Sequence, residues 1–178
     1  NSLNIAMNDQ MEGKPVDLTP LVKLLRMSTE TADTLFVSLD TELQFIDYYV
    51  TVMSSSLGSN FKYIKDIENG IDTAQIMLPS MTLLTFVENA VKHGLSKLPD
   101  DVEKTLKINI RRHDKGVRIE VIDNGHCNKD AQFSNTNTGL KVIRQTLMLI
   151  NEKNKEKMTF GVGNIESGHG FMSWLYIP

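Results

Sequence analysis

The hydrophobic pattern of this 178-residue chain changes its period near residue 58. Before that point, apolar residues recur at helical spacing from Leu18 to about Ala32 and from Leu43 to about Ser56. After it, segments such as Phe61–Ile67 alternate between apolar and polar residues, which is typical of strands. The change predicts two parts: a helical segment over residues 1–57 and an α+β domain over residues 58–178.

Turn and capping residues set the boundaries of the predicted elements. Ser38 or Asp40 is expected to cap the second helix, and Ser54–Ser59 ends it at the boundary between the two parts. Pro79 suits the first turn of a further helix, and Gly94 suits its end. Strands are expected over 61–67, 106–112, 117–122, 158–162 and 171–177, with a hairpin at 114–116, a polar loop over 124–138 and a helix over 140–151.

Composition and charge exclude several classes of protein. The net charge is −3, so the chain has no broad basic field that would bind nucleic acid. No apolar run in the sequence approaches the ~20 residues that a membrane-spanning helix needs. Because Cys127 is the only cysteine, an internal disulfide is excluded, and no Cys/His cluster with metal-binding spacing surrounds it. Function therefore has to come from local motifs in an ordinary globular chain.

The first motif is a polar stripe on the helix predicted to follow Pro79. At helical spacing Glu88, Asn89, Lys92 and His93 share one face. The apolar residues cover the opposite face: Leu83, Leu84, Phe86, Val87, Ala90 and Val91. A carboxylate, an amide oxygen and two potential cations can together hold a hydrated Mg²⁺ and the phosphates bound to it. Taken alone, such a stripe is more often a solvated surface.

The second motif, Asp123–Gly125, lies where a predicted strand ends. A carboxylate at that place can accept a hydrogen bond from an exocyclic amine. Gly125 would allow a positive φ and the close approach of a flat ligand. The competing interpretation is an ordinary Asp-Asn-Gly turn.

The third motif, Thr138-Gly139-Leu140, joins the polar loop to the last predicted helix. Free backbone N–H groups at a helix start bind phosphate, and Gly139 removes side-chain obstruction. The competing interpretation is a simple N-cap by Thr138.

The order and placement of the three motifs resemble the GHKL family of ATP-binding proteins. That family includes sensor histidine kinases, type II DNA topoisomerases, a heat-shock chaperone and mismatch-repair ATPases. The helix motif is similar to the family's N box, Asp123–Gly125 to its first G box and Thr138–Leu140 to its second. The resemblance implies a Bergerat-type ATP-binding fold, a two-layer α/β sandwich, here preceded by a dimerisation-type helical segment.

The helical part narrows the resemblance to LytS-like sensor histidine kinases. Leu21–Arg26, Ser38–Tyr49, Leu78-Pro79 and Tyr176–Pro178 carry it, so it runs over nearly the whole chain. It implies a kinase core that transfers the γ-phosphoryl group of ATP to a histidine, for relay to a response regulator. It further implies a cytoplasmic domain of a bacterial inner-membrane sensor that forms a homodimer through the helical segment.

The resemblance also assigns roles to single residues. Asn89 would bind Mg²⁺ through its amide oxygen, and Glu88 would be the polarising carboxylate. Lys92 and His93 would face the phosphates. The remaining matched residues would bind the nucleotide: Asp123 the adenine amine, Gly125 and Gly139 by close backbone approach, Thr138 near the triphosphate and Leu140 as part of the second G box.

Three departures from the family pattern leave alternatives open. Asn1–Asn4 is similar to the sequence that follows the phosphoacceptor histidine. None of the four histidines (His93, His113, His126, His169) fits the acceptor position, so we expect the acceptor to lie before Asn1.

Cys127 and Asn137 replace glycines of the two G boxes. They motivate an alternative, a signalling module that has lost catalysis. A GHKL ATPase of another class would leave the helices over 21–49 unexplained. His126 and His169 are expected to be loop residues.

Overall fold

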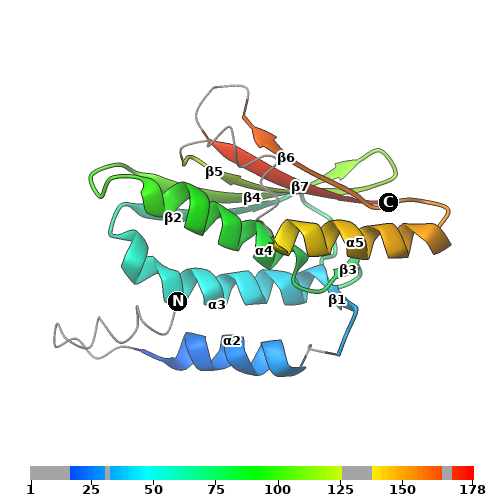
Figure 1. The fold of residues 1–178 in the computed structure, drawn as a ribbon, viewed down its shortest axis with the longest axis horizontal. Helices are drawn as coiled ribbons and strands as arrows, with labels where there is room; N and C mark the ends of the chain where they lie inside the picture. The colour runs from blue at the N-terminus through cyan, green and yellow to red at the C-terminus, as the bar shows by residue number, and fades with distance from the viewer. Residues whose placement is uncertain (1–16, 31–32, 126–137, 166–169) are drawn as a thin grey trace.

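The computed structural model describes residues 17–30, 33–125, 138–165 and 170–178. Figure 1 shows the elements in their order along the chain. The helical elements are α2 (Thr19–Glu30), α3 (Leu39–Leu57), α4 (Thr82–Asn89), the π-helical turn η2 (Ala90–Gly94), the 3₁₀ turn η3 (Leu95–Lys97) and α5 (Thr138–Lys153). The strands are β1 (Phe36–Ser38), β2 (Phe61–Ile67), β3 (Met77–Pro79), β4 (Lys104–His113), β5 (Gly116–Asp123), β6 (Thr159–Asn164) and β7 (Phe171–Ile177).

Five strands form one mixed sheet in the order β2-β4-β5-β7-β6. β2 and β4 are parallel, and α4 lies between them in the chain, as a parallel pair requires a crossover connection. The other neighbours are antiparallel, and β4 and β5 form the predicted hairpin, with Asp114 at a positive φ in its turn. In this register Asp123 ends β5 between Leu106 and Phe171.

Helices α3, α4 and α5 cover one face of this sheet, and α2 packs on α3 away from the sheet (Figure 1). The buried apolar side chains of the sheet and of these three helices form one hydrophobic cluster, which includes Phe45, Phe86, Ile108 and Leu147. The predicted α+β architecture is therefore confirmed. Because α3 shares this core with the sheet, the division at residue 57 remains a prediction.

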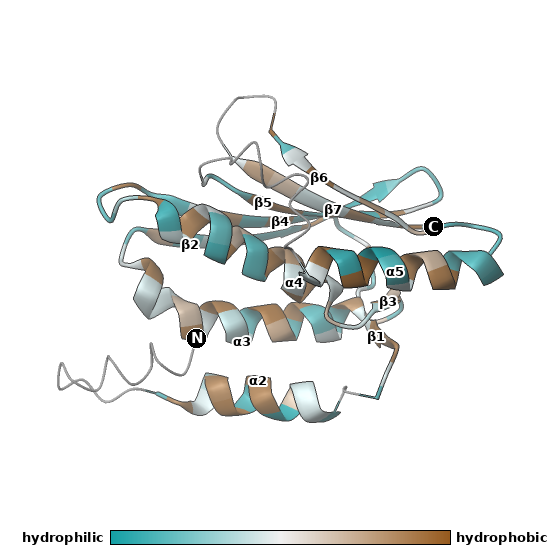
Figure 2. Ribbon diagram, in the orientation of Figure 1, coloured by the Kyte–Doolittle hydropathy of each residue, from teal (hydrophilic) through white to brown (hydrophobic). Residues whose placement is uncertain are grey.

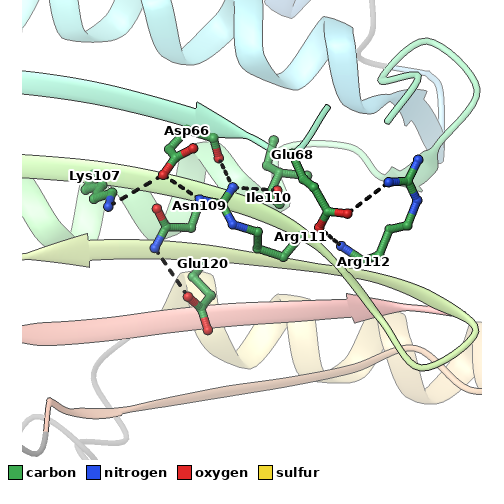
Figure 3. A network of polar contacts seen from close by, with 8 residues as sticks. All are labelled: Asp66, Glu68, Lys107, Asn109, Ile110, Arg111, Arg112 and Glu120. Carbon is green, nitrogen blue, oxygen red and sulfur yellow. Dashed lines mark hydrogen bonds and ion pairs between the residues drawn. The ribbon is translucent and has the colours of Figure 1, made fainter. Parts of the chain in front are cut away.

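The opposite face of the sheet carries polar side chains that pair across the strands (Figure 3). Asp66 of β2 accepts from Arg111 of β4 and lies 3.8 Å from the Nζ of Lys107. Asn109 donates to Glu120 of β5 at 3.5 Å. The hydrogen bond from Arg111 is the main reason that the pKa of Asp66 falls below its usual value. This alternation of apolar and charged positions makes one face of β4 core and the other surface.

Two boundaries differ from the sequence prediction. Pro79 does not open a helix: it is the last residue of β3, pairs with Phe36 of β1, and α4 begins at Thr82. Gly94 is the last residue of η2, as predicted for the helix end, but a 3₁₀ turn over Leu95–Lys97 follows it directly, so the helical run continues past the predicted end. Among the described residues, no helix is long and apolar enough to cross a membrane.

Candidate functional site

Helix α4 and the turn η2 present the predicted polar stripe. All six apolar residues of the predicted buried face lie in the core. Glu88, Lys92 and His93 are exposed, and Asn89 is partly buried. After Asn89 the α-helix widens into a π-helical turn over Ala90–Gly94, a local distortion that often occurs at functional sites. The buried and the polar face predicted for this helix are therefore confirmed, whereas the π-helical turn was not predicted.

The charges along this stripe influence one another. Although Glu88 reaches the surface, its partial withdrawal from water raises its pKa, and the nearby Lys92 opposes that rise. The pKa of His93 is lowered, chiefly by desolvation and then by Lys97 and Lys92. His93 is therefore mainly neutral at pH 7 and adds little positive charge to the stripe.

Asp123 is a buried carboxylate at the end of β5. Its side chain is 2% exposed, and its Oδ1 accepts from the backbone N–H of Gly125 at 2.8 Å. Within the described residues no Lys, Arg or His forms an ion pair with it. Burial outweighs the bond from Gly125 and raises the pKa of Asp123 to about 6. A partner that donates a hydrogen bond to this carboxylate would offset its burial.

Two glycines allow Asp123 to lie directly against η2. A Cβ on Gly94 would come within 2.3 Å of the Asp123 Oδ1, and a Cβ on Gly125 would come within 2.3 Å of the Gly94 Cα. Gly125 does not have a positive φ, so the backbone conformation expected from the sequence is wrong. Gly125 instead packs closely against Gly94. The sequence indicated Gly94 only as a helix end.

The side chain of Asn124 fixes the end of β5, a role that was not predicted from the sequence. Its Oδ1 accepts from the Thr105 N–H at 2.7 Å, and its Nδ2 donates to the Glu103 carbonyl oxygen at 2.7 Å. These bonds tie the residue after Asp123 to the start of β4. An Asn following a strand-terminal Asp is the sequence signal that could have indicated it.

The third motif begins α5. The helix starts at Thr138, and Leu140 packs against the hydrophobic core. Helix α5 contacts α4 and β3, which brings it to the same face of the sheet as the stripe. His126, Cys127, Asn137 and His169 lie outside the described residues. The structure thus sets Asp123 and Gly125 against Gly94 of η2, the turn that carries Lys92 and His93, and it places Thr138 and Gly139 on a neighbouring helix.

Within the described part of the chain, no three His, Cys, Asp or Glu side chains gather as a metal cage would require. Mg²⁺ does not need such a cage, because it often binds one or two protein oxygens together with substrate phosphates and water. The single amide oxygen of Asn89 beside Glu88 and Lys92 fits that mode of binding.

Comparisons with known proteins find sensor histidine kinases by sequence and the fold of their catalytic domains by structure. No family model matches the chain. It is 25% identical over 143 residues to the sensor histidine kinase YpdA of Escherichia coli, covering 80% of this chain and 24% of YpdA. It is 32% identical over 89 residues to the E. coli sensor histidine kinase BtsS, and this match covers 50% of this chain and 15% of BtsS. It is 28% identical over 108 residues to the sensor protein LytS of Oceanobacillus iheyensis, covering 61% and 18%. The chain thus spans a quarter or less of these relatives.

Solved structures agree on the fold. The catalytic domain of the histidine kinase ThkA superposes with a TM-score of 0.57 at 16% identity, covering 80% of this chain and 93% of that domain. The histidine kinase domain of a blue-light-activated kinase from Erythrobacter litoralis gives a TM-score of 0.57 at 15% identity, covering 97% and 80%. The resemblance stated from the motifs is confirmed. The chain is related to the LytS, BtsS and YpdA sensor histidine kinases and has the fold of a histidine kinase catalytic domain.

Proposed function

We propose that the chain is the catalytic core that binds Mg·ATP and transfers the γ-phosphoryl group to a histidine. The observation that carries this proposal is Asp123, a buried carboxylate that has no ion-pair partner among the described residues and lies against Gly94 of η2, the turn that follows Asn89. An adenine amine would supply a further hydrogen-bond donor beside the Gly125 N–H. The fold of histidine kinase catalytic domains supports the same ligand.

We assign each residue of the stripe a proposed role from its environment. Asn89 would hold Mg²⁺ through its amide oxygen, and Lys92 would neutralise phosphate charge. His93, mainly neutral at pH 7, would donate or accept a hydrogen bond rather than add charge. Glu88, whose pKa is raised, would polarise the acceptor imidazole. When bound, Mg·ATP supplies the phosphoryl group, and catalysis rests mainly on positioning and charge neutralisation.

The helix start of the third motif completes the proposed nucleotide site. Thr138 is exposed at the first residue of α5, so its hydroxyl would reach a phosphate bound at the start of this helix. Gly139 adds no side chain there, and Leu140 anchors the turn in the core. These assignments, like those of the stripe, are proposals for mutational tests.

The acceptor and the partners are proposed from the family. The four histidines of the sequence do not match the acceptor position, so the acceptor would be a histidine outside this chain. ThkA has been solved in complex with the response regulator TrrA. We propose a response regulator as the partner here too, with the chain acting as the cytoplasmic part of a membrane sensor.

The proposal is tested by calorimetric titration of the chain with ATP, with and without Mg²⁺. Wild type should bind, and Mg²⁺ should strengthen binding. Asn89→Ala should remove most of the Mg²⁺ dependence but leave adenosine binding, whereas Asp123→Asn should weaken both. Asp66→Asn, on the opposite face of the sheet, is the matched control and should bind as wild type does. A wild-type chain that binds no ATP at millimolar concentration contradicts the proposal.

The alternative of a non-catalytic signalling module rests on Cys127 and Asn137, which lie outside the described residues. It is tested by joining an upstream histidine segment of a relative to Asn1 and assaying for phosphohistidine. Robust incorporation excludes the alternative. Hydrolysis of ATP without any histidine acceptor would instead favour a GHKL ATPase of another class.

A further inference from the structure

Glu42 of α3 is a buried carboxylate to which the proposed chemistry gives no role. It is 0% exposed, and its partners are backbone N–H groups rather than a basic side chain. The N–H of Met81 donates to Oε1, while those of Leu83 and Leu84 donate to Oε2 at 3.0 and 3.3 Å. Desolvation nevertheless raises the pKa of Glu42. A charge buried in this way is stabilised only while these donors keep their places.

The three donors are the first backbone groups of α4. Met81 is its N-cap residue, with a left-handed φ of 65° and no capping bond from its own side chain. The first N–H groups of a helix need an acceptor, and a Ser, Thr, Asp or Asn at the N-cap usually supplies it. Here the acceptor comes from another helix, and its negative charge also suits the helix dipole. The start of α4 therefore depends on α3.

Helix α3 also contacts α4, which ends at Asn89. Tyr49 lies two turns after Glu42 on α3 and is buried. The pKa of Tyr49 is raised by burial and then by the negative charge of Glu88. Along α4, Leu83 and Asn89 are only ~9 Å apart at the usual helical rise. Helix α3 thus holds the start of the short helix that carries the stripe, and it lies along that helix in Figure 1.

We propose that Glu42 is a positioning residue for the nucleotide site: through it, a displacement of α3 moves α4 and with it Glu88 and Asn89. Helix α2 packs on α3, so the contact connects the whole helical segment to the stripe. A rigid short helix passes on a shift of its first turn to its last, since the backbone hydrogen bonds between turns keep its length. This inference rests on the proposed function, because its readout is nucleotide binding.

The test compares Glu42→Gln and Glu42→Ala with Asp47→Asn in calorimetric titrations with Mg·ATP. Asp47 is the matched control, because it lies on the same helix but pairs with Lys65 and Tyr63 of β2 instead of α4. Loss of buried hydrogen bonds should raise the ATP dissociation constant about fivefold for the Gln variant and about tenfold or more for the Ala variant. Asp47→Asn should stay within about twofold of wild type, because its ion pair is partly exposed. If folded Glu42 variants bind Mg·ATP as wild type does, the inference about Glu42 is overturned, whereas the proposed function is unaffected.

A second measurement uses the wild-type chain, so it does not depend on the stability of a variant. Coupling between two sites is reciprocal, so bound Mg·ATP must in turn stabilise the Glu42 contact. We expect Mg·ATP to slow hydrogen exchange at the amides of Met81, Leu83 and Leu84. The Thr41 amide, which bonds to Ser38 at the start of α3, serves as the control and should change less. Unchanged exchange at the three amides in a chain that does bind Mg·ATP overturns the inference, whereas absence of binding overturns the proposed function itself.

Discussion

At the scale of single residues, the burial of Asp123 lowers the stability of the folded chain at neutral pH. Its pKa of about 6 in the folded chain lies above the ordinary value of 3.8. The folded state therefore binds its proton more tightly than the unfolded state, and this contribution is present at low pH. It is lost as the pH rises from about 4 through about 6. Above that range the buried negative charge opposes folding.

Replacing Asp123 by Asn should therefore stabilise the nucleotide-free chain. Asn keeps an acceptor for the Gly125 N–H but carries no charge. At ~1.4 kcal/mol per pKa unit, the free energy of unfolding should rise by up to about 3 kcal/mol at pH 7. The gain should fade to about zero near pH 4. Urea unfolding at several pH values measures it, and a variant less stable than wild type at pH 7 would contradict the burial argument.

Gly94 should tolerate no side chain. In Gly94→Ala the new Cβ would meet the Asp123 Oδ1 at 2.3 Å, so either the carboxylate or η2 must move. We expect a loss of about 1–3 kcal/mol in stability and weaker ATP binding. Gly163→Ala is the matched control, since a Cβ there meets nothing within 4 Å. Equal stability and ATP affinity in the two variants would show that the Gly94 contact is unimportant.

At the scale of elements, α3 begins with a local cap whereas α4 does not. Ser38 accepts from the Thr41 N–H at 3.1 Å through its side chain. Ser38→Ala should therefore lower the free energy of unfolding by about 1 kcal/mol, measured by urea unfolding. Ser56→Ala near the end of α3 should change stability much less, because that hydroxyl only donates to the Met53 carbonyl oxygen on the surface. A neutral Ser38→Ala would contradict the assigned cap.

The same contrast explains how much of the fold and site could be predicted from the sequence. The cap of α3, the two faces of α4 and the strands of the five-stranded sheet follow from local period and capping residues. β1 and β3 have three residues each, too few to show a period, and Pro79 was therefore assigned to a helix. The Glu42 cap and the Gly94 contact join residues far apart in the sequence, and no local pattern encodes such contacts.

At the scale of the whole molecule, α2 carries exposed apolar residues in addition to those that pack against the core. Leu24 and Met27 pack toward the core, whereas Leu18, Val22 and Leu25 are 43%, 61% and 53% exposed. Their spacing places these three on a single stripe of the helix. Figure 2 shows hydrophobic residues along much of α2. A second copy of the helix would cover this stripe, in agreement with the proposed homodimer.

Leu25→Glu should therefore weaken self-association at least about tenfold, because a charge would replace a residue at the centre of the proposed interface. Sedimentation velocity over a range of concentrations measures the effect. Val142→Glu provides the control, since Val142 is 54% exposed on α5 and lies outside the proposed interface. A wild-type chain that stays monomeric at high concentration would contradict dimerisation through α2.

The central claim is that Asp123 recognises the adenine amine in the site beside α4. The most direct measurement compares the binding of ATP with that of ITP, which carries a carbonyl oxygen in place of that amine, to wild type and to Asp123→Asn. We predict that wild type binds ATP at least about tenfold more tightly than ITP, because ITP would set an acceptor oxygen against the buried carboxylate and leave it with only the Gly125 N–H as a donor. The preference should largely disappear in the variant. Equal affinity of wild type for ATP and ITP would contradict the account.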